Sequence, residues 1–167
     1  MRFYDWLNNI INAGLLCCSY QDKTLDAKSK LHLMDIVLDA NGASYLCEMQ
    51  ANGFELPYET IHREFHNYIN GKYKANFRNE KGHGYSSCIY CEYDGDIDID
   101  TTSTTLLGCR GRVILAPYSF VQLYLDKNCN IDIVCPETSR AKVDYWTGAV
   151  INIDGNGRID LNEHQTD

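Results

Sequence analysis

Hydrophobic residues recur at helical spacing at the start of the chain, and further along they form short runs separated by turn residues. From about residue 2 to residue 16 the apolar side chains share one face, which predicts an amphipathic helix. Residues 19–30 are polar and predict a connection or a short helical turn. A second helical stripe follows Pro57 and ends at Asn70-Gly71, which predicts a helix over residues 58–69.

Between these helices the pattern favours a β-hairpin. Residues 31–39 and 44–50 are rich in apolar residues, and Asn41-Gly42 is a strong signal for a tight turn between antiparallel strands. A turn centred on this dipeptide places Asp35 directly opposite Glu48, with Gln50 two residues further on the same face.

After residue 82, apolar strand-like runs alternate with turns at Asp94-Gly95, 108–111, 126–130 and 154–157. We expect an antiparallel β-meander on which the second helix packs, and therefore an α+β fold. Residues 1–167 are expected to form one domain, with a helix–hairpin–helix part (1–81) and a β-meander part (82–167). We expect no solenoid repeat, because turn chemistry explains the resemblance among the Asp- and Asn-containing turns.

Composition narrows the functional classes. The chain has 167 residues and a net charge of −8, which argues against a surface that binds nucleic-acid phosphates directly. No apolar run is long enough to span a bilayer, and the start of the chain does not have the pattern of a secretory signal. We therefore expect a cytoplasmic protein without membrane contact, whose eight cysteines are mostly reduced and buried.

Five acidic residues occupy alternate positions in one segment, namely Glu92, Asp94, Asp96, Asp98 and Asp100. In an extended strand all five project to one side, and such a face is stable only when it is solvated, ion-bound or docked on a basic surface. We expect these carboxylates to be exposed and to bind a partner. The competing outcome is pairing with basic residues of the segment 61–81, which has five Lys or Arg against two Glu.

Asp35, the Asn-Gly turn and Glu48-Met49-Gln50 resemble the active-site hairpin of the PD-(D/E)XK nuclease superfamily, in particular its transposase-associated branch. The resemblance covers residues 30–70. It implies that Asp35 and Glu48 would be Mg²⁺ ligands and that Gln50 would occupy the third motif position. Carboxylate oxygens are suitable ligands for Mg²⁺.

Further residues are candidate metal ligands. His62 and His66 are four residues apart on the second predicted helix and share one face. Asn152, Asp154, Asn156, Asp160 and Glu163 match ligand positions of an EF-hand-like loop, but the alternating pattern before them favours a hairpin that turns over 154–157.

The leading functional hypothesis is a small acidic binding protein without catalysis of its own and without a cofactor. It would act as an inhibitor or adaptor of the kind that phages and mobile elements use against host defences, imitating nucleic acid towards a basic nuclease or nucleic-acid-binding protein. The alternative is a Mg²⁺-dependent nuclease with Asp35, Glu48 and Gln50 as catalytic residues.

Overall fold

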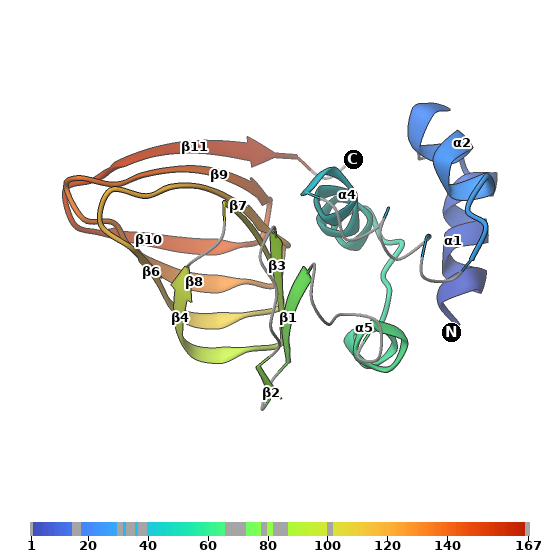
Figure 1. The fold of residues 1–167 in the computed structure, drawn as a ribbon, viewed down its shortest axis with the longest axis horizontal. Helices are drawn as coiled ribbons and strands as arrows, with labels where there is room; N and C mark the ends of the chain where they lie inside the picture. The colour runs from blue at the N-terminus through green and yellow to red at the C-terminus, as the bar shows by residue number, and fades with distance from the viewer. Residues whose placement is uncertain are drawn as a thin grey trace.

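The computed structural model describes residues 2–14, 18–29, 32, 36, 40–65, 73–77, 80–81, 87–99 and 102–165. In these ranges, a group of helices lies on one side of a β-solenoid (Figure 1). The helices are α1 (Phe3–Asn12), α2 (Cys18–Leu25), α4 (Ala40–Ala51) and α5 (Tyr58–Phe65). None of the helices described is long and apolar enough to cross a membrane.

The strands follow the helices in the chain. They are β1 (Tyr73–Phe77), β2 (Glu80–Lys81), β3 (Ser87–Cys91), β4 (Asp94–Ile99), β5 (Ser103–Leu107), β6 (Arg110–Leu115), β7 (Phe120–Leu125), β8 (Asn130–Val134), β9 (Arg140–Trp146), β10 (Val150–Asp154) and β11 (Arg158–His164).

In the described ranges these strands form two sheets. The seven-stranded sheet has the order β11-β9-β7-β5-β3-β1-β2, and the four-stranded sheet has the order β10-β8-β6-β4. From β3 onwards consecutive strands alternate between the sheets, and every neighbouring pair is parallel. The chain therefore winds through about four turns of a solenoid.

The expectation of an antiparallel meander on a helix-packed α+β fold was wrong. Most of the expected strands exist, but each corner passes the chain to the opposite sheet instead of folding it back on the strand before. The hairpin predicted to turn over residues 154–157 is not formed either. The strands on its two sides do not pair with each other, because β10 pairs with β8 and β11 pairs with β9. A short polar corner with glycine, asparagine or aspartate suits either connection, so turn residues alone do not distinguish a hairpin from a solenoid corner.

The expectation of no repeat was also wrong. Cys109 and Cys129 immediately precede β6 and β8, at equivalent places in successive turns, and Arg110, Asn130 and Val150 are aligned in neighbouring strands. These positions are 20 residues apart in the chain. Each turn therefore presents its side chains in register with those of the next.

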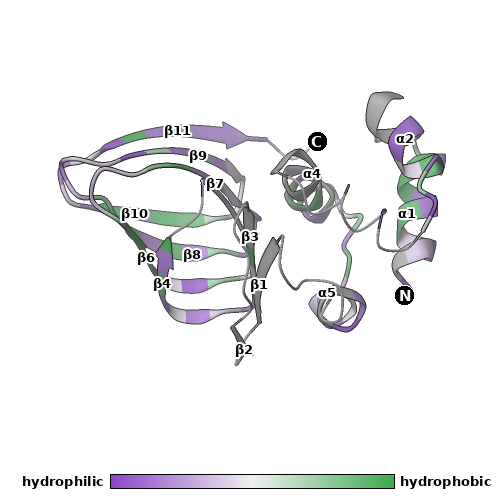
Figure 2. Cartoon of the chain, viewed as in Figure 1, coloured by the Kyte–Doolittle hydropathy of each residue, from purple (hydrophilic) through white to green (hydrophobic). Residues whose placement is uncertain are grey.

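Alternation along the strands creates two buried layers. Leu123 of β7, Val113 of β6 and Ile131 of β8 belong to a buried cluster between the two sheets. Tyr124 of β7 points the other way and joins Leu46 of α4 in a second cluster, outside the seven-stranded sheet. Figure 2 shows hydrophobic and hydrophilic residues alternating along the strands of the four-stranded sheet. Helix α4 therefore covers one outer face, whereas the outer face of the four-stranded sheet carries exposed polar residues.

The hairpin expected over residues 31–50 is not formed. Asn41, Gly42 and the following apolar run all lie within α4. Leu46, Met49 and Gln50 are buried, and this spacing is compatible with a helix face. The large apolar area available on the seven-stranded sheet stabilises a helix here, which overrides the local turn preference of Asn-Gly.

The two other predicted helices are present. Helix α1 begins at Phe3 and buries Trp6, Leu7 and Ile10, as its apolar stripe predicts. Helix α5 begins at Tyr58, directly after Pro57. Residues 15–16 and 66–69, which the predictions also assigned to helices, lie outside the described ranges.

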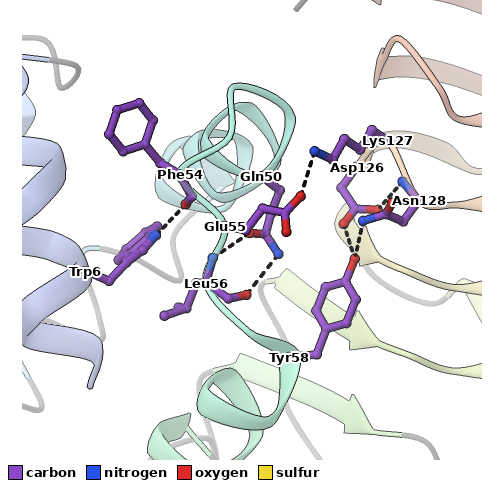
Figure 3. Close-up of polar contacts among 9 residues, drawn as sticks. All are labelled: Trp6, Gln50, Phe54, Glu55, Leu56, Tyr58, Asp126, Lys127 and Asn128. Carbon is purple, nitrogen blue, oxygen red and sulfur yellow. Dashed lines mark hydrogen bonds and ion pairs between the residues drawn. The ribbon is translucent and has the colours of Figure 1, made fainter. Parts of the chain in front are cut away.

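A polar junction joins the helices to the solenoid (Figure 3). The Tyr58 hydroxyl donates to Asp126 Oδ2 over 2.6 Å, and Asn128 Nδ2 donates to the Tyr58 oxygen over 3.0 Å. Beside them, Lys127 Nζ lies 2.7 Å from Glu55 Oε1. The helical part is therefore attached by side-chain hydrogen bonds and an ion pair as well as by apolar packing.

Five cysteines in the described ranges are free and buried, as expected. They are Cys47, Cys91, Cys109, Cys129 and Cys135. Burial raises the pKa of the Cys47, Cys91 and Cys129 thiols, so these groups are neutral and act as small apolar residues. The side chains of Cys17, Cys18 and Cys88 lie outside the description.

Candidate functional site

Three aspartates of the predicted acidic ladder lie on the outer face of β4. Asp94, Asp96 and Asp98 are exposed, and the intervening Ile97 is buried in the solenoid interior. The expectation that these three carboxylates are exposed on one side is confirmed. Glu92 precedes the strand with a φ of 50° and is half-buried, so it is not in line with them, and Asp100 lies outside the described residues.

The neighbouring strand supplies basic residues to the same face. Arg110 is aligned with Asp94, and Arg112 is aligned with Asp96. Arg112 Nε lies 2.9 Å from Asp96 Oδ1, and Nη2 lies 2.5 Å from Oδ2. These hydrogen bonds lower the pKa of Asp96 and raise the pKa of Arg112. One member of the ladder is therefore neutralised within the sheet.

The rest of this outer face remains acidic. Asp132 of β8 and Asp154 of β10 are also exposed on it, and Asn152 Nδ2 donates to Asp132 Oδ1 over 2.8 Å. The face thus displays Asp94, Asp96, Asp98, Asp132 and Asp154 beside Arg110 and Arg112. We refer to this set as the acidic face. Of the basic residues expected as competitors, Lys72 and Arg78 lie outside the described ranges, and the side chains of Lys74 and Lys81 are not described.

The three residues of the nuclease alternative are not arranged on a hairpin. Glu48 and Gln50 are two residues apart on α4, so their side chains point to different sides of the helix. Gln50 is buried, and its side-chain amide makes two hydrogen bonds with the Leu56 backbone (Figure 3). Gln50 Nε2 donates to the Leu56 carbonyl oxygen over 3.0 Å, and the Leu56 amide donates to Gln50 Oε1 over 2.6 Å. Asp35 lies outside the described residues. The strand pairing that would have joined Glu48 to Asp35 is absent because α4 is a helix.

The candidate metal ligands do not form a cluster in the parts of the chain that the structure describes. No group of three or more His, Cys, Asp or Glu side chains gathers there to hold a metal ion. Asp154 lies on the four-stranded sheet and Asp160 on the seven-stranded sheet, Asn156 lies in the corner between their strands, and Glu163 is near Thr147. His62 belongs to α5 but its side chain is not described, and His66 lies outside the described ranges.

A polar pocket of about 350 Å³ opens between α4 and the seven-stranded sheet. Ser44 and Glu48 of α4, with Asn52 directly after the helix, form one wall. Lys142 and Asp144 of β9 with His164 of β11 contribute to the other wall. We refer to this cavity as the α4–β9 pocket. The sequence interpretation missed it, because it did not predict that 142, 144 and 164 lie on neighbouring strands.

Asp144 is the most buried charged group of this pocket, with 6% of its side chain exposed. Its Oδ1 accepts from Asn162 Nδ2 over 2.6 Å and lies 3.1 Å from His164 Nε2. Its Oδ2 accepts from Gln122 Nε2 over 3.1 Å and lies 3.3 Å from Lys142 Nζ. Desolvation raises the pKa of Asp144, but these hydrogen bonds and the charge of Lys142 outweigh it, so the pKa is lowered overall.

The parallel register explains why these groups meet. Asp144 is aligned with Asn162 on one side and with Tyr124 on the other, and Lys142 is aligned with Gln122. His164 also stacks on Trp146, with ring centroids 4.7 Å apart and planes at 19°. The side chains that surround Asp144 are thus fixed by the sheet, and the pocket wall on this side is preorganised.

Comparisons of the chain with protein-family models, with curated proteins and with solved structures found no match. The geometry of the acidic face and of the α4–β9 pocket therefore carries the functional argument.

Proposed function

We propose that the protein is a cytoplasmic binding protein without catalysis of its own, and that its acidic face docks on a basic partner. The observation that carries this proposal is the row of exposed Asp94, Asp96 and Asp98 on β4. The partner would be a nuclease or another nucleic-acid-handling protein, towards which the protein acts as an inhibitor or adaptor.

The geometry of a parallel sheet supports imitation of nucleic acid. Carboxylates two residues apart on a strand are separated by about 6.6 Å, and the sheet holds them in a fixed line. A protein groove that binds successive phosphates has basic residues at comparable spacing. Opposite charge across such an interface mainly accelerates association and excludes wrong partners.

The pairing of Asp96 with Arg112 is compatible with this role. Both side chains are at least half exposed, so solvent screens the ion pair and it contributes little to stability. A basic partner can therefore compete for the Asp96 carboxylate at small cost. Asp98 is aligned with Ile114, so the neighbouring strand places no opposite charge across from this carboxylate.

The test begins with a partner that is captured by cross-linking to the acidic face and then purified. The rates of its association with the protein and of its dissociation are then measured. Replacing Asp94, Asp96 and Asp98 by Asn should slow association about tenfold or more, with a much smaller change in dissociation. Raising the salt concentration should lower the association rate of the wild type until it approaches the rate of the variant. The matched control removes three exposed charges from the helical part, by Asp22→Asn, Asp26→Asn and Glu59→Gln.

Two results would overturn the proposal. One is equal slowing by the control variant, which would show that only net charge matters. The other is cleavage of plasmid DNA by the pure protein with Mg²⁺ or Mn²⁺, abolished by Glu48→Gln, which would favour the nuclease alternative.

A further inference from the structure

We propose that two copies of the protein associate through the last turn of the solenoid, with β10 of each copy paired antiparallel to β11 of its partner. In the described ranges these two strands are edge strands, at the ends of the four-stranded and the seven-stranded sheet. The proposal goes beyond the proposed function and does not depend on it. Strand β4, which carries Asp94, Asp96 and Asp98, lies at the opposite edge of the four-stranded sheet.

The last turn leaves apolar side chains of the solenoid interior uncovered. Ile131 and Ile133 of β8 and Val143 of β9 are fully buried in the interior. The aligned residues of the last turn are also apolar, namely Ile151, Ile153 and Leu161. Ile153 is 48% exposed and Leu161 is 47% exposed. Edge strands and terminal turns are usually protected by lysine, proline or a polar cap, but β10 and β11 contain neither lysine nor proline, so this end favours a cover.

The backbone at this end determines which kind of cover fits. The Val150 N–H and the Asp154 carbonyl of β10 are hydrogen-bonded on the β8 side. The Arg158 N–H and the His164 carbonyl of β11 are hydrogen-bonded on the β9 side. Backbone direction alternates along a strand, so the odd-numbered residues of both strands direct their N–H and C=O groups to the open edge. A cover must therefore present two strand edges at once, at the distance that separates the two sheets, and a second copy of the same turn has this separation.

A two-fold axis parallel to the strands fixes the register between the two copies. Asn156 is the middle residue of the corner between β10 and β11, and Asn152 and Asp160 are each four residues from it. These two residues therefore lie at the same level across the solenoid, and the axis places Asn152 opposite the partner's Asp160. The pairing is antiparallel, because the corner reverses the chain between β10 and β11.

Apolar residues meet in this register. Ile151 lies opposite the partner's Leu161. Ile153 lies opposite the partner's Ile159. All four residues are odd-numbered, so each pair exchanges two backbone hydrogen bonds, and the side chains remain on the interior side of the extended sheets. The two strand pairs together therefore cover the exposed parts of Ile153 and Leu161.

The outer sides of the strands are also complementary. Asp154 lies opposite the partner's Arg158, and both side chains are exposed in the single copy. Arg158 Nε is 3.2 Å from Asp160 Oδ1 of its own chain, and the guanidinium has further donors for the partner's Asp154. Opposite charges across two strands stabilise their pairing, whereas like charges destabilise it. Pairing of each strand with its own copy is disfavoured, because it places Asp160 opposite the partner's Asp160.

Association stops at two copies, because the other end of the solenoid has a different shape. In the described ranges the seven-stranded sheet continues through β1 and β2, whereas the four-stranded sheet ends at β4. The last turn of one copy therefore does not fit on the first turn of another. The two-fold pairing also uses both open edges of the last turn, so the assembly is closed.

Sedimentation equilibrium of the full-length protein measures this association without any partner or ligand. Between about 1 and 500 μM, the mass should rise from the 19.1 kDa of one chain towards twice that value and no further. Hydrogen exchange at the amides of 151, 153, 159 and 161 should slow about tenfold or more as the dimer forms, because each amide then donates across the interface.

Charge reversal tests the register. Asp154→Arg and Arg158→Glu should each weaken self-association about tenfold or more, because each places like charges opposite one another twice in the dimer. An equimolar mixture of the two variants should associate like the wild type, because opposite charges then face each other at both places. This recovery also shows that both variants fold. The matched controls Asp22→Arg and Lys28→Glu reverse exposed charges of the helical part and should leave association unchanged.

The proposal is wrong if the mass stays at one chain at every concentration or keeps growing beyond two chains. It is also wrong if the mixture of the two variants associates no better than each variant alone. None of these results bears on the acidic face, because they are measured without a basic partner.

Discussion

At the residue scale, a buried carboxylate organises the junction between helices and solenoid. Asp126 is fully buried and accepts from the Tyr58 hydroxyl, from the Gly108 and Asn128 amides and from the Cys129 thiol. Burial raises its pKa, although these donors oppose the shift. Its contribution to stability is therefore fully present below the ordinary value of 3.8 and declines as the pH rises through the folded-state pKa.

Removing the hydroxyl of Tyr58 should destabilise the protein. Tyr58→Phe leaves Asp126 and Asn128 without this partner, and we expect a loss of about 1–2 kcal/mol in the free energy of unfolding, measured by urea denaturation. The matched control is Tyr118→Phe, because Tyr118 is 85% exposed and should lose nothing. Equal unfolding midpoints for both variants would contradict a stabilising junction.

The second residue-scale prediction concerns Asp144, whose pKa is lowered by its four partners despite desolvation. A carboxylic acid whose pKa is lowered by folding stabilises the fold at pH values above its unfolded-state pKa. This contribution is lost as the pH falls through the folded-state pKa. We therefore expect Asp144→Asn to cost about 1–3 kcal/mol near neutral pH, and the difference from wild type to shrink below about pH 3.8.

Urea denaturation between about pH 7 and pH 2.5 measures this difference. The other ionisable side chains that line the pocket near Asp144 are Lys142, His164 and Glu48. Asp160→Asn is the control, because Asp160 is an exposed member of an ion pair and should change stability by about 0.5 kcal/mol or less. A difference that grows on acidification would refute the assignment.

At the scale of single elements, the closeness of successive turns requires glycine at one place in particular. Gly111 of β6 has a φ of 120°, and a Cβ there would lie 2.3 Å from the Gly95 carbonyl oxygen of β4. Gly95 has nearly the same φ, 118°, but a Cβ there would meet nothing within 4 Å. A side chain at either position would strain the backbone, but only a side chain at Gly111 would also collide with the neighbouring strand.

We expect Gly95→Ala to cost about 1–3 kcal/mol through strain alone, and Gly111→Ala to cost distinctly more because the backbone of β4 must also move. Calorimetric or denaturant unfolding of the two variants measures the difference. If both variants lost the same stability, the turns would not be as tightly stacked as the register indicates.

At the scale of the whole molecule, the solenoid separates two surfaces of different chemistry. The acidic face lies on the four-stranded sheet, whereas the α4–β9 pocket lies on the outer side of the seven-stranded sheet, under the helices. The parallel sheets hold the side chains of the acidic face and of the sheet side of the pocket in register.

Local patterns determined several elements without help from tertiary contacts. The apolar stripe with Trp6, Leu7 and Ile10 predicted α1, and Pro57 predicted the start of α5. The alternation around Ile97 predicted that Asp94, Asp96 and Asp98 are exposed together. These features depend only on side-chain periodicity along one element, which the sequence contains directly.

Only the tertiary structure decided how the strands pair and which residues meet at the pocket. The spacing of 20 residues between Cys109 and Cys129 is a repeat signal, but a corner of glycine, asparagine or aspartate permits a hairpin equally well. Residues 40–51 became helix α4 because the sheet offers an apolar face, despite the Asn-Gly turn signal. Lys142, Asp144 and His164 meet because parallel register joins distant segments, a long-range condition that local propensity does not encode.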